Sequence, residues 1–487
     1  MPKFSSSFAA MQYQTVIGLE VHIQLNTASK LFCADAASFG SAPNTHVSPV
    51  TLAHPGSLPV LNQTAIDYAV RLGLALGCHI SSHSFFDRKH YFYPDLPKAY
   101  QTSQQTHPIL SGGSLLLKSG AVPIHHIHLE EDAGKSIHDA DAHHTCIDLN
   151  RAGVPLLELV TDPALHSSQQ AFDFITELRR LVRWLSICDG NMEEGSLRCD
   201  ANISIKPQGQ TTLGTKVEVK NLNSIRNVKR AIDAEVARQT QLLESGQAVV
   251  QQTRGYDADR NTTLPQRDKE EANDYRYFPC PDLPPIQLSE AYIQNIASTM
   301  PALPQALEAH YTQALGLPQA DAEVLAEDKT FSDYFNALTA HTPHAKPAAN
   351  WMLGPLKSWC NDAQQTLSQF PIAPAHMAQL VNLVQDGSVS FSAAATRLLP
   401  AFILAPTTAP AQLANQLGLV QTSNTEQLQT WVSEAIAAMP DKVKEYQKGK
   451  KGLIGLFVGE VKKRSGGKAD PQAVMQMLQA QLANATV

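Results

Sequence analysis

Glu20 and His22 are the first residues in this sequence whose types and spacing suggest chemistry. From Leu19 to Leu25, apolar and polar residues alternate, which is the pattern of a β-strand with one buried face. Residues two apart on a strand lie on the same face, so a carboxylate and an imidazole would stand side by side. Such a pair can bind a divalent cation. The pattern also fits an amphipathic edge strand whose polar face is covered by water.

The segment HLEEDAGKS, residues 128–136, contains the densest group of acids in the chain. Its ending is similar to the phosphate-binding P-loop, but Leu129 stands where that motif requires a glycine. Three acids directly upstream would also repel a phosphate unless a metal ion lay between them. Because Mg²⁺ accepts both carboxylates and nucleotide phosphates as ligands, a metal-bound nucleotide could bind here. The alternative is a charged turn after a strand.

Glu158 is a single acid within the apolar run VPLLELV. A carboxylate is rarely buried without a partner. Glu158 therefore either faces water at the edge of a sheet or acts as a ligand in a cleft. We favour the ligand.

A further predicted strand, residues 197–204, has an unusually diverse polar face. Arg198, Asp200, Asn202 and Ser204 alternate there with apolar residues, and the strand that follows repeats the pattern with Lys216, Glu218 and Lys220. Several strands that bring acids, histidine, arginine and lysine to one surface suit metal-bridged phosphoryl transfer.

Residues 11–290 must position these side chains. This part of the chain is rich in short β-branched runs separated by turn residues. Apolar residues at helical spacing predict helices over about 167–186 and 224–245. The pattern predicts an α+β domain whose strands are mostly antiparallel.

The remainder of the chain is predicted to be helical. The proline-rich segment FPCPDLPPI ends the first part near residue 286. Helix-period runs fill residues 303–345 and 350–402 of an expected helical domain, residues 291–405. A Pro/Ala linker covers 404–412, and residues 413–487 are expected to form a separate small helical domain. We therefore expect three domains, which agrees with the length of 487 residues.

Composition places the chain among ordinary globular proteins. It is 43% hydrophobic and 17% charged, with a formal net charge of −7, which argues against wholesale nucleic-acid binding. No apolar run is long enough to span a membrane and the N-terminus has no proper signal-peptide core. Seven scattered cysteines are typical of a reduced, cytoplasmic protein.

A local cluster of basic residues near the C-terminus contrasts with the acidic balance of the whole chain. Between residues 442 and 468 only Glu445 and Glu460 oppose it. The basic residues that we single out as an RNA-binding surface are Lys448, Lys450, Lys451, Lys462, Lys463, Arg464 and Lys468. A solvated helical face is the alternative.

Taken together, these segments resemble one family in order along nearly the whole chain. The family is that of the B subunits of bacterial tRNA-dependent amidotransferases. The segments that are similar to it are VIGLEVHIQLNTASKLFC, YFYPDLPKAYQTSQ, HLEEDAGKS, DLNRAGVPLLELVTDP, EEGSLRCDANISI, KVEVKNLNSIRNVKRAI and DYRYFPCPDLPP. The tail GKKGLIGLFVGEVKKRSGGKADP resembles the C-terminal RNA-binding domain of those subunits.

The resemblance implies a ligase that works as a heterotrimer. Its A subunit would release ammonia from glutamine, and a small C subunit would wrap the other two. The B subunit would use ATP and Mg²⁺ to phosphorylate the side-chain carboxylate of Glu-tRNA(Gln) or Asp-tRNA(Asn), and ammonia would then displace the phosphate. The first domain would be a cradle related to the glutamine synthetase and guanido kinase fold. A scaffold protein that binds tRNA without catalysis is the runner-up, and a stand-alone metallohydrolase would leave the basic tail unexplained.

The same resemblance implies roles for individual residues. His22, Glu131 and Glu158 would be metal ligands, with Glu20 and Asp200 as catalytic members of the same shell. Lys89, Lys98 and Asp274 would line the route of ammonia.

One motif departs from the family pattern. Many members carry four cysteines that bind zinc, where this chain has Cys33, Asp35, Ser48 and Thr51. A closed zinc site needs four ligands, so a single thiolate predicts that zinc is absent.

Overall fold

The computed structural model describes residues 13–484 apart from 142, 269–271, 422–424 and 467–468. The chain divides into two compact units, one ending at Leu303 and one beginning at Pro304. Each unit has an apolar core of its own, and the second unit has two. The expected boundaries of three domains remain a prediction.

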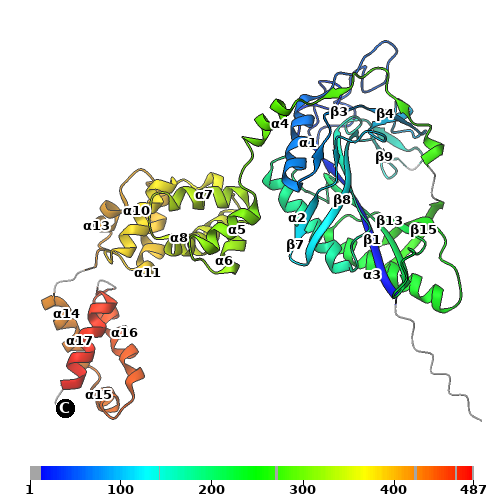
Figure 1. The fold of residues 1–487 in the computed structure, drawn as a ribbon. Helices are drawn as coiled ribbons and strands as arrows, with labels where there is room; N and C mark the ends of the chain where they lie inside the picture. The colour runs from blue at the N-terminus through cyan, green and yellow to red at the C-terminus, as the bar shows by residue number, and fades with distance from the viewer. Residues whose placement is uncertain (1–12, 142, 269–271, 422–424, 467–468, 485–487) are drawn as a thin grey trace, which may run out of the picture. The chain divides into compact units, whose positions relative to one another are not determined.

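A large sheet forms the centre of the first unit (Figure 1). Its strands lie in the order β15-β14-β13-β12-β1-β11-β8-β6-β2, with β7 paired to β8. Every pairing in it is antiparallel except that of β13 with β14. The strands are β1 (Tyr13–Gln24), β2 (His79–Ile80), β6 (Leu110–Ser111), β7 (Ser114–Leu117), β8 (Gly120–Glu131), β11 (Pro155–Thr161), β12 (Leu197–Pro207), β13 (Val217–Lys220), β14 (Gln252–Asp257) and β15 (Thr262–Asp268). The prediction of a mostly antiparallel sheet is confirmed.

Smaller strands lie outside this sheet. They form three groups: β4 (Asp87–His90) with β5 (Tyr100–Ser103) and β16 (Phe278–Pro279); β3 (His83–Ser84) with β17 (Ile286–Gln287); and β9 (Lys135–Ile137) with β10 (Cys146–Asp148). The group around β4 matters for the site because it carries Lys89.

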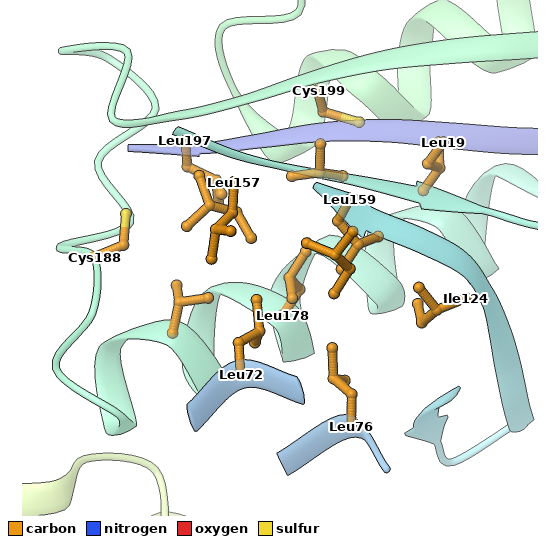
Figure 2. Packing of buried hydrophobic residues seen from close by; sticks show 14 of the residues in the cluster. Leu19, Leu72, Leu76, Ile124, Leu157, Leu159, Leu178, Cys188, Leu197 and Cys199 are labelled. Carbon is orange, nitrogen blue, oxygen red and sulfur yellow. The ribbon is translucent and has the colours of Figure 1, made fainter. Parts of the chain in front are cut away.

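Helices pack on one face of the large sheet. They are α1 (Gln63–Leu76), α2 (Ser168–Trp184) and α3 (Ile225–Glu244), and α4 (Glu290–Ala297) packs against α1. Figure 2 shows Leu19, Leu157, Leu159 and Leu197 of the sheet above Leu178 of α2 and Leu72 and Leu76 of α1. Because side chains alternate along a strand, the residues between these leucines face the other way, and those are the polar ones.

The two predicted helices of the first unit are confirmed as α2 and α3. Each begins after a serine whose side chain accepts a hydrogen bond from a backbone N–H of the first turn. Ser167 accepts from Gln170 at 3.2 Å, and Ser224 accepts from Asn227 at 3.1 Å. Such caps satisfy donors that the helix leaves unpaired, so they fix where each helix starts.

The second unit is helical throughout its described residues, as predicted. One core contains buried residues from Tyr311 to Leu419, and the other contains buried residues from Leu428 to Leu482. The first region comprises α5 (Pro304–Gln313), α6 (Gln319–Leu325), α7 (Lys329–Thr339), α8 (Ala345–Trp351), α9 (Lys357–Ala363), α10 (Pro374–Gln385), α11 (Phe391–Ala393), α12 (Leu399–Leu404) and α13 (Pro410–Gln416). The tail comprises α14 (Thr425–Ala437), α15 (Pro440–Gln447), α16 (Ile454–Arg464) and α17 (Pro471–Asn484).

None of the helices in the described residues combines the length and the apolar character needed to cross a membrane.

Candidate active site

The register of three strands brings the predicted polar residues to one face of the large sheet. His22 of β1 lies opposite Glu158 of β11 and Arg198 of β12. Two residues away on β1, Glu20 lies opposite Asp200. Directly opposed residues of antiparallel strands share a face, so these side chains form two adjacent rows.

The row that contains His22 forms a compact group of ligand atoms. His22 Nε2 lies 3.2 Å from Glu158 Oε2 and 3.7 Å from Glu130 Oε1. The ligand atoms of these three residues all lie within 4.8 Å of one another. His128 borders the group, with its Nε2 3.4 Å from Glu130 Oε2 and 3.6 Å from Glu158 Oε2.

The electrostatics of this group are those of an anionic pocket. Burial alone would lower the pKa of His22, but the hydrogen bond with Glu158 and the charges of Glu158 and Glu130 outweigh it and raise the pKa to about 9. Burial would raise the pKa of Glu158, yet the nearby imidazoles of His128 and His22 hold it well below its ordinary value. Two carboxylates that attract positive charge this strongly fit a divalent cation, which would take the place of the proton on His22.

Glu130 joins this group, whereas Glu131, predicted as a ligand, does not. Consecutive residues of a strand point to opposite faces, and β8 places Glu131 on the other side of the sheet. There Glu131 Oε1 accepts hydrogen bonds from Lys98 Nζ and, at 2.9 Å, from the backbone N–H of Thr102.

Glu20 and Asp200 form the second row, each in contact with a side chain of a neighbouring strand. Glu20 Oε1 accepts a hydrogen bond from Asn202 Nδ2 at 2.7 Å. Asp200 Oδ2 lies 2.6 Å from Lys220 Nζ, which also lies 3.4 Å from Glu218 Oε1. These carboxylates therefore border the group around His22.

A cavity of about 570 Å³ opens beside Glu20. Gly18, Leu213 and Gly214 line it together with Asn202. Gly18 precedes Glu20 on the same face of β1, so its missing side chain leaves room next to the acids. The cavity is large enough for part of a nucleotide.

The three residues predicted along an ammonia route lie in different surroundings. Lys89 lines a cavity of about 450 Å³ with Tyr91 and Tyr275, and its Nζ lies 4.8 Å from the Tyr275 ring centroid. Lys98 and Glu131 line another cavity, of about 240 Å³. Asp274 is exposed in a short 3-10 turn.

The chain matches two family models. Residues 15–294 match the "GatB/GatE catalytic domain" and residues 333–482 match the "GatB domain". Proteins named as the B subunit of aspartyl/glutamyl-tRNA(Asn/Gln) amidotransferase are similar to it over nearly their whole length. That of Nitrosococcus oceani is 45% identical, over 97% of this chain and 100% of its own, and that of Synechococcus elongatus is 43% identical, over 97% and 98%.

This chain belongs to the family of amidotransferase B subunits. The resemblance inferred from its motifs is therefore confirmed, and so is its extent along the chain. The catalytic-domain match covers the sheet from residue 15 of β1 onward and the residues around His22.

At the position of the zinc motif, this member of the family has a carboxylate at the centre of a hydrogen-bond network. Asp35 Oδ2 accepts hydrogen bonds from the Thr51 hydroxyl at 2.6 Å, from the Ser48 backbone N–H at 2.8 Å and from the Cys33 thiol at 3.3 Å. Burial would raise the pKa of Asp35, but these donors outweigh it and lower the pKa. The four residues thus bond to one another, and three of them lack the thiolate that zinc prefers.

The second family match includes the tail and its predicted RNA-binding residues. Lys462 and Lys463 are exposed in the last turn of α16. Arg464 pairs with Glu460 at 2.9 Å and Glu434 at 3.3 Å, Lys450 pairs with Glu445 at 3.0 Å, Lys451 lies over the Tyr446 ring, and Lys448 is exposed. Lys468 lies outside the described residues.

Proposed function

We propose that this chain activates the amino-acid side chain during tRNA-dependent amidation. The family to which it belongs forms a carbon–nitrogen bond on misacylated tRNA, with glutamine as amido donor. The observation that supports a catalytic role for this chain is the group of His22, Glu130 and Glu158 on the polar face of the sheet.

A carboxylate cannot be amidated directly because oxide is a poor leaving group. In the proposed first step, a side-chain carboxylate oxygen of Glu-tRNA(Gln) or Asp-tRNA(Asn) attacks the γ-phosphorus of ATP. The bond between that phosphorus and the β,γ-bridging oxygen breaks, and ADP leaves with the electron pair. Ammonia then attacks the acyl carbon, loses a proton, and releases inorganic phosphate. The product is Gln-tRNA(Gln) or Asn-tRNA(Asn).

The polar face offers places for the reactants of this step. His22, Glu130 and Glu158 would hold Mg²⁺, which neutralises negative charge between phosphates when bound. Glu130 replaces Glu131 in this set because of the geometry of β8. Glu20 and Asp200 would border the phosphates, with part of the nucleotide in the cavity beside Gly18.

Ammonia would arrive from the A subunit on the other side of the sheet. The pair formed by Lys98 and Glu131 lines a cavity there, and Lys89 lines a cavity on the polar side. We retain Lys89, Lys98 and Asp274 as candidates for this route. Ammonia must stay unprotonated and apart from bulk water, so a route lined by a few paired polar groups suits it.

The proposal extends to the whole complex. The first unit would be the cradle related to glutamine synthetase, and the tail would bind tRNA through its lysines. The A subunit and the small C subunit would complete a cytoplasmic heterotrimer.

The test is the release of inorganic phosphate from ATP by the purified heterotrimer. We expect release only with Glu-tRNA(Gln) or Asp-tRNA(Asn), and we expect Glu130→Gln to remove it while tRNA binding persists. If tRNA binds and no charged tRNA stimulates release, the chain is a non-catalytic scaffold instead.

A further inference from the structure

Arg198 stands beside the group of His22, Glu130 and Glu158. It lies on β12 directly opposite His22. Its Nη1 donates a hydrogen bond of 2.8 Å to Asp132 Oδ2. Asp132 follows the end of β8 and is buried, with 6% of its surface exposed. One edge of the guanidinium is therefore fixed close to the proposed metal ligands.

The rest of the guanidinium is available for a ligand. The arginine guanidinium carries five N–H donors, and within the described part of the chain the hydrogen bond to Asp132 is the one that the Arg198 guanidinium makes. Its side chain is 31% exposed although it rises from the middle of the sheet. Donors that are held in place and still reachable are typical of a site for an anion with several oxygens.

Two neighbouring cations, Lys220 and Arg151, make more polar contacts than Arg198 does. Lys220 contacts two carboxylates, those of Asp200 and Glu218. Arg151 donates from Nε to the Ala133 carbonyl at 3.0 Å and from Nη2 to the Gly134 carbonyl at 2.6 Å. Of Lys220, Arg151 and Arg198, Arg198 therefore has the most N–H donors that make no hydrogen bond within the described residues.

We propose that Arg198 is a catalytic residue that holds the γ-phosphoryl group of ATP while it is transferred to the substrate carboxylate. This inference rests on the proposed function. As the bond to the β,γ-bridging oxygen breaks and the bond to the carboxylate oxygen forms, negative charge spreads over the three other oxygens of the phosphoryl group. A guanidinium fork matches two such oxygens at once and stabilises that charge. Asp132 is the positioning residue, because its buried carboxylate fixes the guanidinium edge.

Binding of two nucleotides to the intact heterotrimer tests the contact without relying on activity. Arg198→Ala should weaken binding of a non-hydrolysable ATP analogue about tenfold and leave ADP binding unchanged, because ADP lacks the γ-phosphate. In the same variant, the kcat of tRNA-dependent phosphate release should fall about 100-fold or more, as when a preorganised donor is removed from a transition state. Added guanidinium ion should restore part of that rate.

Arg198→Lys provides a second variant if the alanine variant does not fold, because it keeps the charge beside Asp132. It should retain ADP binding and still lose about tenfold in kcat, since an ammonium cannot make the forked contact. Arg151→Ala is the matched control: it removes the other arginine next to Asp132 and should leave both nucleotide affinities unchanged.

The possible outcomes separate this inference from the proposed function. If Arg198→Ala lowers ATP-analogue and ADP binding equally, or lowers neither, Arg198 does not contact the γ-phosphate. If the wild-type complex binds both nucleotides but releases no phosphate with any charged tRNA, the proposed function fails. Even then, the affinity for the ATP analogue relative to that for ADP, compared between wild type and Arg198→Ala, shows whether Arg198 contacts the γ-phosphate.

Discussion

The polar face of the sheet and the basic tail differ in how firmly the structure holds their charged side chains. On the sheet, His22, Glu130 and Glu158 are held in one arrangement by strand register, and the protonation of His22 and Glu158 depends on their neighbours. In the tail, basic side chains lie on exposed helix ends, where surface ion pairs contribute little. The comparison teaches that a catalytic group needs particular atoms in particular places, whereas a phosphate-binding surface needs mainly a sum of charge.

The largest effect should come from Glu158→Gln. The change keeps the size of the side chain but removes a charge that faces two imidazoles, so both amidation and phosphate release should fall about a thousandfold or more. Rates measured with the purified heterotrimer test this. Glu193→Gln is the matched control, because Glu193 is exposed in a turn and its loss should have no effect. A rate above a tenth of wild type for Glu158→Gln would remove the metal-ligand proposal.

A smaller and selective effect is expected for Glu131→Gln. Because Glu131 lies across the sheet and pairs with Lys98, glutamine-dependent amidation should fall about tenfold to 100-fold, while phosphate release from ATP stays near wild type. Ammonium chloride supplied in solution should restore much of the amidation. Equal loss of both activities would instead identify Glu131 as a metal ligand, as the motif alone suggested.

In the tail, Lys462→Gln combined with Lys463→Gln should raise the KM for tRNA about tenfold without changing kcat. The salt dependence of tRNA binding should become shallower by about 0.7 to 0.9 in log–log slope for each phosphate contact removed. Titrations at several salt concentrations measure both quantities. An unchanged slope would show that these two lysines do not contact RNA phosphate.

The smallest effect should come from Arg464→Gln. The Arg464 guanidinium already contacts Glu460 and Glu434, so it contributes less free positive charge than its neighbours. We expect less than about a fivefold change in the KM for tRNA, because an exposed ion pair is worth about 1 kcal/mol at most. A change in KM as large as that of the double lysine variant would mean that Arg464 breaks its contacts with Glu460 and Glu434 and binds RNA instead.

The sequence alone predicted the strands and helices of the first unit better than it predicted which residues form the site. Alternation placed Glu20 and His22 on one face, and apolar residues at helical spacing predicted α2 and α3, because these features depend on local spacing. The choice of Glu131 over Glu130 came from the motif as a whole. Counting alternate residues from His128 would have favoured Glu130, since both then lie on the face of Glu158.

The sequence could not predict which residue a charged side chain contacts when the two residues lie far apart in the sequence. Arg198 was predicted to sit on a polar face, but its contact with Asp132 spans 66 positions. The pairing of Lys98 with Glu131 likewise depends on how β5 packs against β8. In the tail, the Arg464–Glu460 pair is local and follows from helical spacing, whereas the contact with Glu434 needs the packing of α14 on α16.

Glu130 and Glu131 follow one another on β8 and serve opposite faces of the sheet. An insertion of one residue upstream in β8 would move Glu130 to the face of Lys98 and bring Leu129 to the position beside His22, so that the group around His22 would lose a carboxylate. Substitutions elsewhere in the strand leave this alternation intact. Natural variation in the family should therefore change the composition of β8 freely at its exposed positions while keeping its length fixed.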